Sequence, residues 1–204
     1  MPKGLHALAI QVAKNRGQSL NAFLNEATER HLQPPTELGP PMWLDDYRER
    51  ASVSESNLQI LRRVIDDQEP IIICGDRHSG KTTLLSVIMR ERLTSATGPM
   101  SAMLWQRTPQ INDPKPLLSI VVSPMQIQNG LGRFEETIKP RAIFVDDLWP
   151  SAVPDVIRGF NHGVTGAVSI SGSIEDGLTM LHPVSRLCGV EMREGRITQV
   201  IQRP

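Results

Sequence analysis

Residues 75–82 have the spacing that is most readily tied to chemistry. Gly75, Gly80, Lys81 and Thr82 fit the pattern G-x-x-x-x-G-K-[ST]. Glycine at the first two positions lets the chain wrap so closely that backbone N–H groups point at phosphate oxygens. In this pattern the Lys81 ammonium binds the β- and γ-phosphates, and the Thr82 hydroxyl is a ligand for Mg²⁺. The pattern predicts a nucleotide phosphate site. The alternative is a turn with a structural role only.

The segments on either side of this loop support the nucleotide interpretation. Ile71–Cys74 is apolar without polar alternation, which is typical of a strand buried on both faces of a parallel sheet. The residues that follow the loop, from Lys81 to about Leu93, predict a helix whose N-terminus faces the same anion. We therefore predict that nucleotide is bound by consecutive residues, namely Gly75, Asp76, Arg77, His78, Ser79, Gly80, Lys81, Thr82 and Thr83.

A second informative stretch is Arg141–Asp147, in which an apolar strand ends in two acidic residues. With the loop upstream, Asp146 is predicted to hold Mg²⁺ together with Thr82. Asp147 is predicted to orient the attacking water or accept its proton, so Lys81 and Asp147 are the catalytic candidates. The alternative is a strand end with two solvated carboxylates.

Composition narrows the function classes. The 204 residues include 22 basic and 22 acidic side chains, so any contact with nucleic acid requires a local patch rather than an overall positive field. Cys74 and Cys188 lie in apolar runs and are predicted to be buried free thiols in a reducing compartment. No stretch approaches the ~20 apolar residues that a bilayer requires. We expect a cytoplasmic protein that reaches a membrane only through partners.

Three segments are predicted along the chain. Residues 1–33 read as two amphipathic helices, with Gly17 ending the first and Ser19 capping the second. Residues 34–51 are a stiff proline-rich linker, within which we expect Trp43, Leu44 and Tyr47 to contact the domain that follows.

Residues 52–204 form the main domain. Strands and helices alternate here and close with a hairpin of strands 184–192 and 197–202, which predicts an α/β domain with a mainly parallel sheet. Ligands bind at the carboxyl ends of such strands.

The segments of the main domain resemble the type II/IV secretion ATPases, the motors of conjugation and of pilus assembly. The matching pieces are the loop with its helix, the acidic strand, 154–163, 168–171, 177–181 and the closing hairpin. The resemblance implies a RecA-like P-loop core that binds ATP with Mg²⁺. It also implies a homo-oligomeric ring, usually a hexamer, with nucleotide between subunits and with secretion or conjugation components as partners at the inner membrane.

The chain departs from this family in several places. Asp147 stands where the family usually has a glutamate, and Gln106 falls within its acidic box. These departures predict an ATPase whose turnover is slow or absent, although Lys81, Thr82 and Asp146 are retained. The candidates to reach the γ-phosphate of a neighbouring subunit are Arg133, Arg141 and Arg158, although a surface salt bridge is the ordinary role of each.

The first thirty residues resemble the helical part of ribbon-helix-helix domains of the antitoxin type. The matching residues are Leu5-His6, Ala13, Gly17 and 19–27. That family reads DNA with a β-ribbon that precedes the first helix. Only Met1–Gly4 precede Leu5 here, so we favour oligomerisation, such as a dimer, or docking through these helices over DNA reading.

Three functions follow from these observations. The first is a motor ATPase of conjugative transfer or type IV secretion. The second is a nucleotide-gated, DNA-associated regulator or plasmid-maintenance factor. The third is a degenerate subunit that binds nucleotide for structure only. All three predict that nucleotide stabilises the fold, whereas phosphate release separates the first from the others.

Overall fold

The computed structural model describes residues 10, 13–14, 17, 19–23, 42–51, 53–95, 102–106, 118–121 and 141–203. The chain divides into two compact units, Met1–Pro41 and Met42–Pro204. Within the described parts, no helix has both the length and the apolar character that crossing a membrane requires.

The first unit keeps the predicted helix end and helix cap. Gly17 has a left-handed φ of 65°, and its amide donates to the Lys14 carbonyl at 3.1 Å. The Ser19 hydroxyl accepts a hydrogen bond from the Ala22 amide at 3.1 Å, as an N-cap does. The Met1–Gly4 segment, on which the DNA-reading alternative depends, lies outside the described residues.

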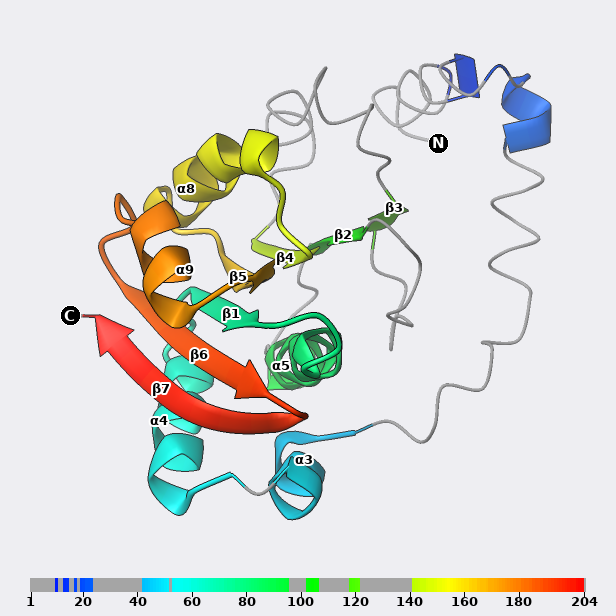
Figure 1. Ribbon diagram of the computed structural model, residues 1–204. Coiled ribbons are helices and arrows are strands. Elements are labelled where there is room, and N and C mark those ends of the chain that lie inside the picture. Colours follow the sequence, from blue (N-terminus) through cyan, green and yellow to red (C-terminus); the bar gives the residue numbers. More distant parts are fainter. Residues whose placement is uncertain are drawn as a thin grey trace. The chain divides into compact units, whose positions relative to one another are not determined.

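The second unit contains a seven-stranded sheet in the order β3-β2-β4-β5-β1-β6-β7 (Figure 1). Every neighbouring pair is parallel except β6 and β7, which confirms the predicted mainly parallel sheet with a closing hairpin. The strands are β1 (Ile71–Gly75), β2 (Ala102–Gln106), β3 (Leu118–Val121), β4 (Ala142–Asp146), β5 (Thr165–Ser171), β6 (Leu187–Arg193) and β7 (Arg196–Arg203).

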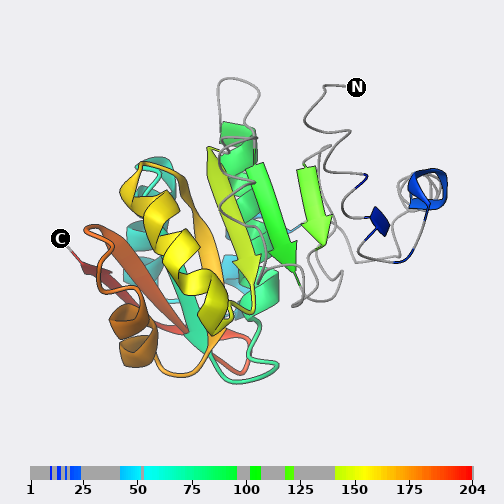
Figure 2. The ribbon, with the colours of Figure 1, turned by 90° about the horizontal axis from the view of Figure 1, so that it is seen from above.

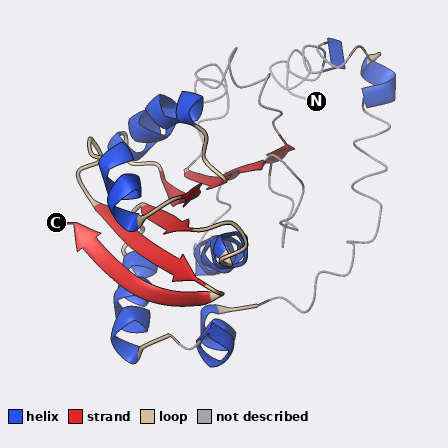
Figure 3. Ribbon diagram, in the orientation of Figure 1, coloured by secondary structure: helices blue, strands red, loops and turns tan. Residues whose placement is uncertain are grey.

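Helices cover both faces of this sheet (Figures 2 and 3). Ile71 and Ile73 of β1 pack in the cluster that contains α3, α4 and α5, whereas Ile72 and Cys74 pack in the cluster that contains α8 and α9. All four side chains are fully buried, which is why β1 shows no polar alternation. The helices are α3 (Leu44–Ala51), α4 (Glu55–Asp66), α5 (Lys81–Ser95), a 3-10 turn at Pro150–Ala152, α8 (Val153–Asn161) and α9 (Ile174–Met180).

The predicted linker is wrong in its second half. Residues 44–51 form α3, and Leu44 is buried in the core of the second unit, as expected of that residue. The Trp43 amide donates to the Asp46 carboxylate at 3.1 Å, and the Leu44 amide donates to Glu91 on α5 at 2.8 Å. Acidic residues in the first turn favour this short helix, but its low apolar content concealed it in the sequence. The proline-rich residues 34–41 lie outside the described part.

The closing hairpin is tighter than predicted. Strand β6 begins at Leu187 and ends at Arg193, and β7 begins at Arg196. The turn is therefore confined to Glu194 and Gly195. Both turn residues have positive φ, 49° and 77°, which matches the twist of a two-residue hairpin. Arg193 and Arg196, predicted to be turn residues, are therefore paired strand residues.

Arg92 joins three elements at the end of the sheet away from the phosphate loop. The side chain is fully buried near the C-terminus of α5. Its guanidinium donates to the Thr165 hydroxyl at 2.6 Å and the Gly166 carbonyl at 2.8 Å, both on β5. It also donates to the Glu69 carbonyl before β1. Desolvation by burial lowers the pKa of Arg92 to about 9, which still leaves the group cationic at neutral pH.

The two cysteines provide a first prediction. Burial raises the pKa of both the Cys74 and Cys188 thiols from 9.0 to about 12, because desolvation disfavours the thiolate. We expect neither thiol of the folded protein to react with iodoacetamide at pH 8, and both to react in urea. Because the folded pKa exceeds the unfolded one, the thiols also cost stability as the pH rises from about 9 to about 12. Mass spectrometry after timed labelling measures the reactivity, and rapid native labelling would contradict burial.

Candidate functional site

The segment from Asp76 to Gly80 curls between β1 and α5. The backbone is left-handed at His78, with φ 65°, and at Gly80, with φ 95°. The Ser79 amide closes the turn on the Asp76 carbonyl at 3.2 Å. This curl borders a cavity of about 660 Å³, lined by Arg77, His78, Ser79, Gly80, Lys81, Thr82, Thr83, Asp146, Asp147, Ser169 and Ser171.

Lys81 folds back over the loop that precedes it. Its ammonium donates to the Gly75 carbonyl at 3.0 Å and the Asp76 carbonyl at 2.6 Å, and the residue is buried. The first turn of α5 contains no acidic residue, and amides in a first turn lack carbonyl partners within the helix. A buried cation and free amide dipoles that converge on one cavity favour an anion with several oxygens.

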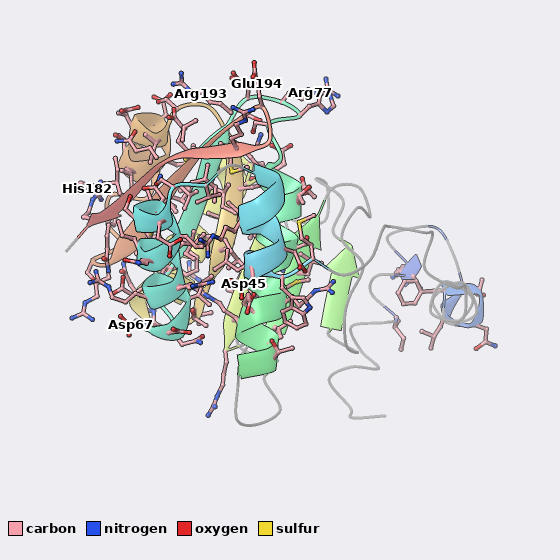
Figure 4. The ribbon with its side chains drawn as sticks, turned by 90° about the horizontal axis from the view of Figure 1, so that it is seen from below. Asp45, Asp67, Arg77, His182, Arg193 and Glu194 are labelled. Carbon is pink, nitrogen blue, oxygen red and sulfur yellow. The ribbon has the colours of Figure 1, made fainter. Side chains whose placement is uncertain are left out.

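Gly75 is required for a reason that the sequence did not reveal. Its φ is 151°, and a Cβ at this position would lie 2.3 Å from the Met192 carbonyl oxygen of β6. Four residues further on, the Ser79 carbonyl accepts a hydrogen bond from the Gly195 amide at 3.0 Å. The hairpin turn thus contacts the loop through a backbone hydrogen bond, and Figure 4 shows Arg77 and Glu194 at the same end of the domain.

Thr82 and Asp146 meet although 64 positions separate them in the sequence. The Thr82 hydroxyl donates to the two carboxylate oxygens at 3.0 and 3.1 Å. Asp146 is the last residue of β4 and is mostly buried, whereas Thr82 belongs to the first turn of α5. The structure therefore brings together the two residues that the sequence selected as metal ligands.

Asp147 lies directly after β4 and also lines the cavity. Its φ of 58° is left-handed, a region in which aspartate is enriched among non-glycine residues. The positive φ turns the chain out of the sheet, and the Asp147 amide then donates to the Ser169 hydroxyl at 2.8 Å. Backbone in so sparsely populated a region is often retained at functional sites.

Ser169 is the site residue that the sequence reasoning missed. It is fully buried in β5, and its hydroxyl donates to the Asp146 carboxylate at 2.9 Å. The available signal was a hydroxyl side chain at an inner position of an otherwise apolar strand. The contact between the closing hairpin and the phosphate loop was also missed, because nothing local in 193–196 identifies what the turn contacts.

Several of the other predicted site residues do not line the cavity. Gly75 and Asp76 do not line the cavity but supply the carbonyls that hold Lys81. Arg141 is exposed at the amino end of β4, opposite the site. Arg158 on α8 pairs with Asp155 at 3.5 Å, the surface role that the alternative anticipated. Arg133 lies outside the described residues.

The residues present fit a Mg²⁺ nucleotide. Ser79 is buried, and its hydroxyl has no hydrogen-bond partner within the described part of the chain, so a phosphate oxygen would satisfy it. Thr82 and Asp146 offer a hydroxyl and a carboxylate, which are hard oxygen donors suited to Mg²⁺ alongside phosphate oxygens. The donor set therefore matches the predicted cofactors.

Part of the chain is similar in sequence to a conjugation protein. No protein-family model matches the chain. The chain is 28% identical over 127 residues to the conjugal transfer protein TrbB of Rhizobium radiobacter, a match that covers 62% of this chain and 39% of TrbB. The chain thus matches about two fifths of the length of that relative.

Solved structures give the fold. The VirB11 ATPase of the Brucella suis type IV secretion system, crystallised with sulphate, superposes with a TM-score of 0.57 at 18% identity, covering 92% of this chain and 65% of VirB11. The DotB ATPase of Legionella pneumophila gives a TM-score of 0.48 at 14% identity, over 79% of this chain and 50% of DotB. The resemblance to the type II/IV secretion ATPases is confirmed, and no comparison addresses the ribbon-helix-helix resemblance of the first unit.

Proposed function

We propose that this relative of the conjugation and secretion ATPases binds Mg-ATP at the cavity beside β1 and hydrolyses it slowly. The observation that carries the proposal is the pairing of the Thr82 hydroxyl with the Asp146 carboxylate at 3.0 Å. A loop lysine alone would suit many anions. A hydroxyl and a carboxylate oriented toward each other beside that lysine are what a phosphate-bound Mg²⁺ requires.

Each residue has a separate task in this proposal. Lys81, which now contacts two loop carbonyls, exchanges them for the β- and γ-phosphate oxygens. The amides of the first turn of α5 and the Ser79 hydroxyl bind the remaining oxygens. Thr82 and Asp146 hold Mg²⁺, which when bound neutralises charge on the phosphates. Asp147 orients the attacking water and accepts its proton.

The proposal includes assembly with further copies of the chain. Arg141, directly before β4, and Arg158, on α8, do not line the cavity of their own subunit. Either one would serve hydrolysis only at the site of a neighbour, as expected of a ring with nucleotide between subunits. We propose that the ring acts at the inner membrane with secretion or conjugation components as partners. The first unit would contribute to assembly or docking.

Titration calorimetry with Mg-ATP tests the proposal directly. We expect one site per chain, together with slow phosphate release. Light scattering with and without Mg-ATP reports the assembly. Absence of heat at millimolar nucleotide would exclude the proposed function, whereas binding without phosphate release would leave only the nucleotide-bound switch or the degenerate subunit.

Asp147→Asn separates binding from chemistry. The amide keeps the size of the side chain but cannot accept the proton of the attacking water. We expect kcat to fall about 100-fold, which lies at the lower end of the contribution of a general base, while the Kd of Mg-ADP changes less than threefold. Single-turnover phosphate release and calorimetry measure the two quantities. Equal rates for the variant and the wild type would remove Asp147 from the chemistry.

A further inference from the structure

We propose that Ser169 is a positioning residue that holds both aspartates of the nucleotide site through one hydroxyl group. The hydroxyl donates to the Asp146 carboxylate at 2.9 Å and accepts from the Asp147 amide at 2.8 Å. The Ser169 carbonyl accepts from the Leu148 amide at 2.7 Å. Three consecutive residues at the end of β4, namely Asp146, Asp147 and Leu148, are therefore hydrogen-bonded to this single serine.

Strand alternation explains why the serine lies at this position. Ala167 of β5 and Phe144 of β4 belong to the core cluster on the α5 side of the sheet, and Ser169 and Asp146 are each two residues further on. Both side chains therefore face the first turn of α5, where Thr82 lies. Asp146 receives one hydroxyl from Thr82 on the helix and a second from Ser169 on the neighbouring strand.

The left-handed turn at Asp147 gives the hydroxyl its second task. The paired register of β4 and β5 runs from Ala142 and Thr165 to Val145 and Val168, and β4 ends one residue later at Asp146. The Asp147 amide, one residue beyond the end of β4, donates its hydrogen to the Ser169 hydroxyl at 2.8 Å. A partly buried amide without an acceptor is costly, so the serine stabilises this turn.

The inference rests on the proposed function and extends it. The Thr82 hydroxyl would offer a lone pair to Mg²⁺ while its hydrogen faces Asp146, and Ser169 would hold the same carboxylate from the neighbouring strand. Outer partners of metal ligands contribute about 10- to 100-fold to metal affinity. Ser169 should therefore affect the part of nucleotide affinity that depends on Mg²⁺ and leave the part that the loop supplies unchanged.

The test compares the Kd of ADP in Mg²⁺ with its Kd in EDTA, for wild type, Ser169→Ala and Ser169→Thr. For Ser169→Ala we expect the gain in affinity from Mg²⁺ to fall about tenfold, with the Kd in EDTA unchanged. Ser169→Thr keeps the hydroxyl and should keep most of the gain. Thr165→Val is the matched control, because it removes a buried hydroxyl at the other end of β5, where it bonds Arg92. It should lower the Tm without changing the gain.

Amide hydrogen exchange of the nucleotide-free protein supplies an independent readout. We expect the Asp147 amide to exchange about tenfold faster in Ser169→Ala and at the wild-type rate in Thr165→Val. If Ser169→Ala retained the full gain from Mg²⁺, or left the exchange rate of Asp147 unchanged, the inference would be wrong while the proposed function stood. If the wild type bound no ADP, or bound it equally in Mg²⁺ and EDTA, the Mg-nucleotide site would fail and the inference with it.

Discussion

Lys81→Ala is expected to weaken Mg-ATP binding at least about 100-fold and to abolish measurable phosphate release. The side chain is mostly buried, and its ammonium already lies over the loop, held by the Gly75 and Asp76 carbonyls. The alanine variant removes the one buried cation among the residues that line the described cavity. Amide dipoles and Ser79 would remain, but they cannot neutralise a triphosphate by themselves.

The control for this experiment is Arg48→Ala. Arg48 is about half exposed and pairs with Glu55 at 3.1 Å on the surface of the same unit. The substitution therefore removes one positive charge outside the cavity. Its Kd should match that of the wild type. Calorimetry measures both variants, with Tm as the check on folding. Binding by Lys81→Ala within threefold of the wild type would show that nucleotide is held elsewhere.

Arg92→Met is expected to destabilise the protein by several kcal/mol, because each buried acceptor left without its donor costs about 1–3 kcal/mol. Methionine fills similar volume but donates no hydrogen bond. The Gly166 and Glu69 carbonyls and the Thr165 hydroxyl would then lose the donor that joins α5 to β5 and to the segment before β1. Domains are commonly stable by only about 5–15 kcal/mol, so this variant would be marginal.

Urea unfolding measures this effect, with Arg62→Met as the control. Arg62 makes an exposed ion pair with Asp45 on α3, and its loss should cost at most about 1 kcal/mol. Arg92→Lys should lie between the two, because one ammonium cannot reach all the acceptors of a guanidinium. Any residual folded Arg92→Met should still bind Mg-ADP, since Arg92 lies at the far end of α5 from Lys81. A loss below about 1 kcal/mol would contradict the role of Arg92 as a buried anchor.

The two predictions concern opposite ends of one helix. The first turn of α5 carries Lys81 and Thr82 at the cavity, and its last turns carry Arg92 under the sheet. Between these ends α5 packs through buried apolar residues such as Leu84, Leu85 and Ile88, whose contacts are not directional. The polar anchors at its two ends therefore fix where the phosphate loop lies relative to β4 and β5.

Local chemistry was enough to predict much of this protein. The glycine and lysine spacing of 75–82 identified the loop, because few other residue types allow backbone to approach a phosphate. The unbroken apolar run of β1 and the acidic end of β4 indicated strands buried on both faces and ending at one edge. Because the carboxyl ends of parallel strands lie at one edge of the sheet, the sequence already predicted that Asp146 lies near Thr82.

Only the tertiary structure decided which groups hold these residues in place. The hydroxyl of Ser169 and the amide of Gly195 act on residues far away in the sequence, and their partners depend on the sheet order and on strand register. Helix α3 likewise depends on contacts with α5 rather than on its own weak apolar pattern. Sequence periodicity reports what a segment buries, whereas the identity of its neighbour is set by how the strands are ordered.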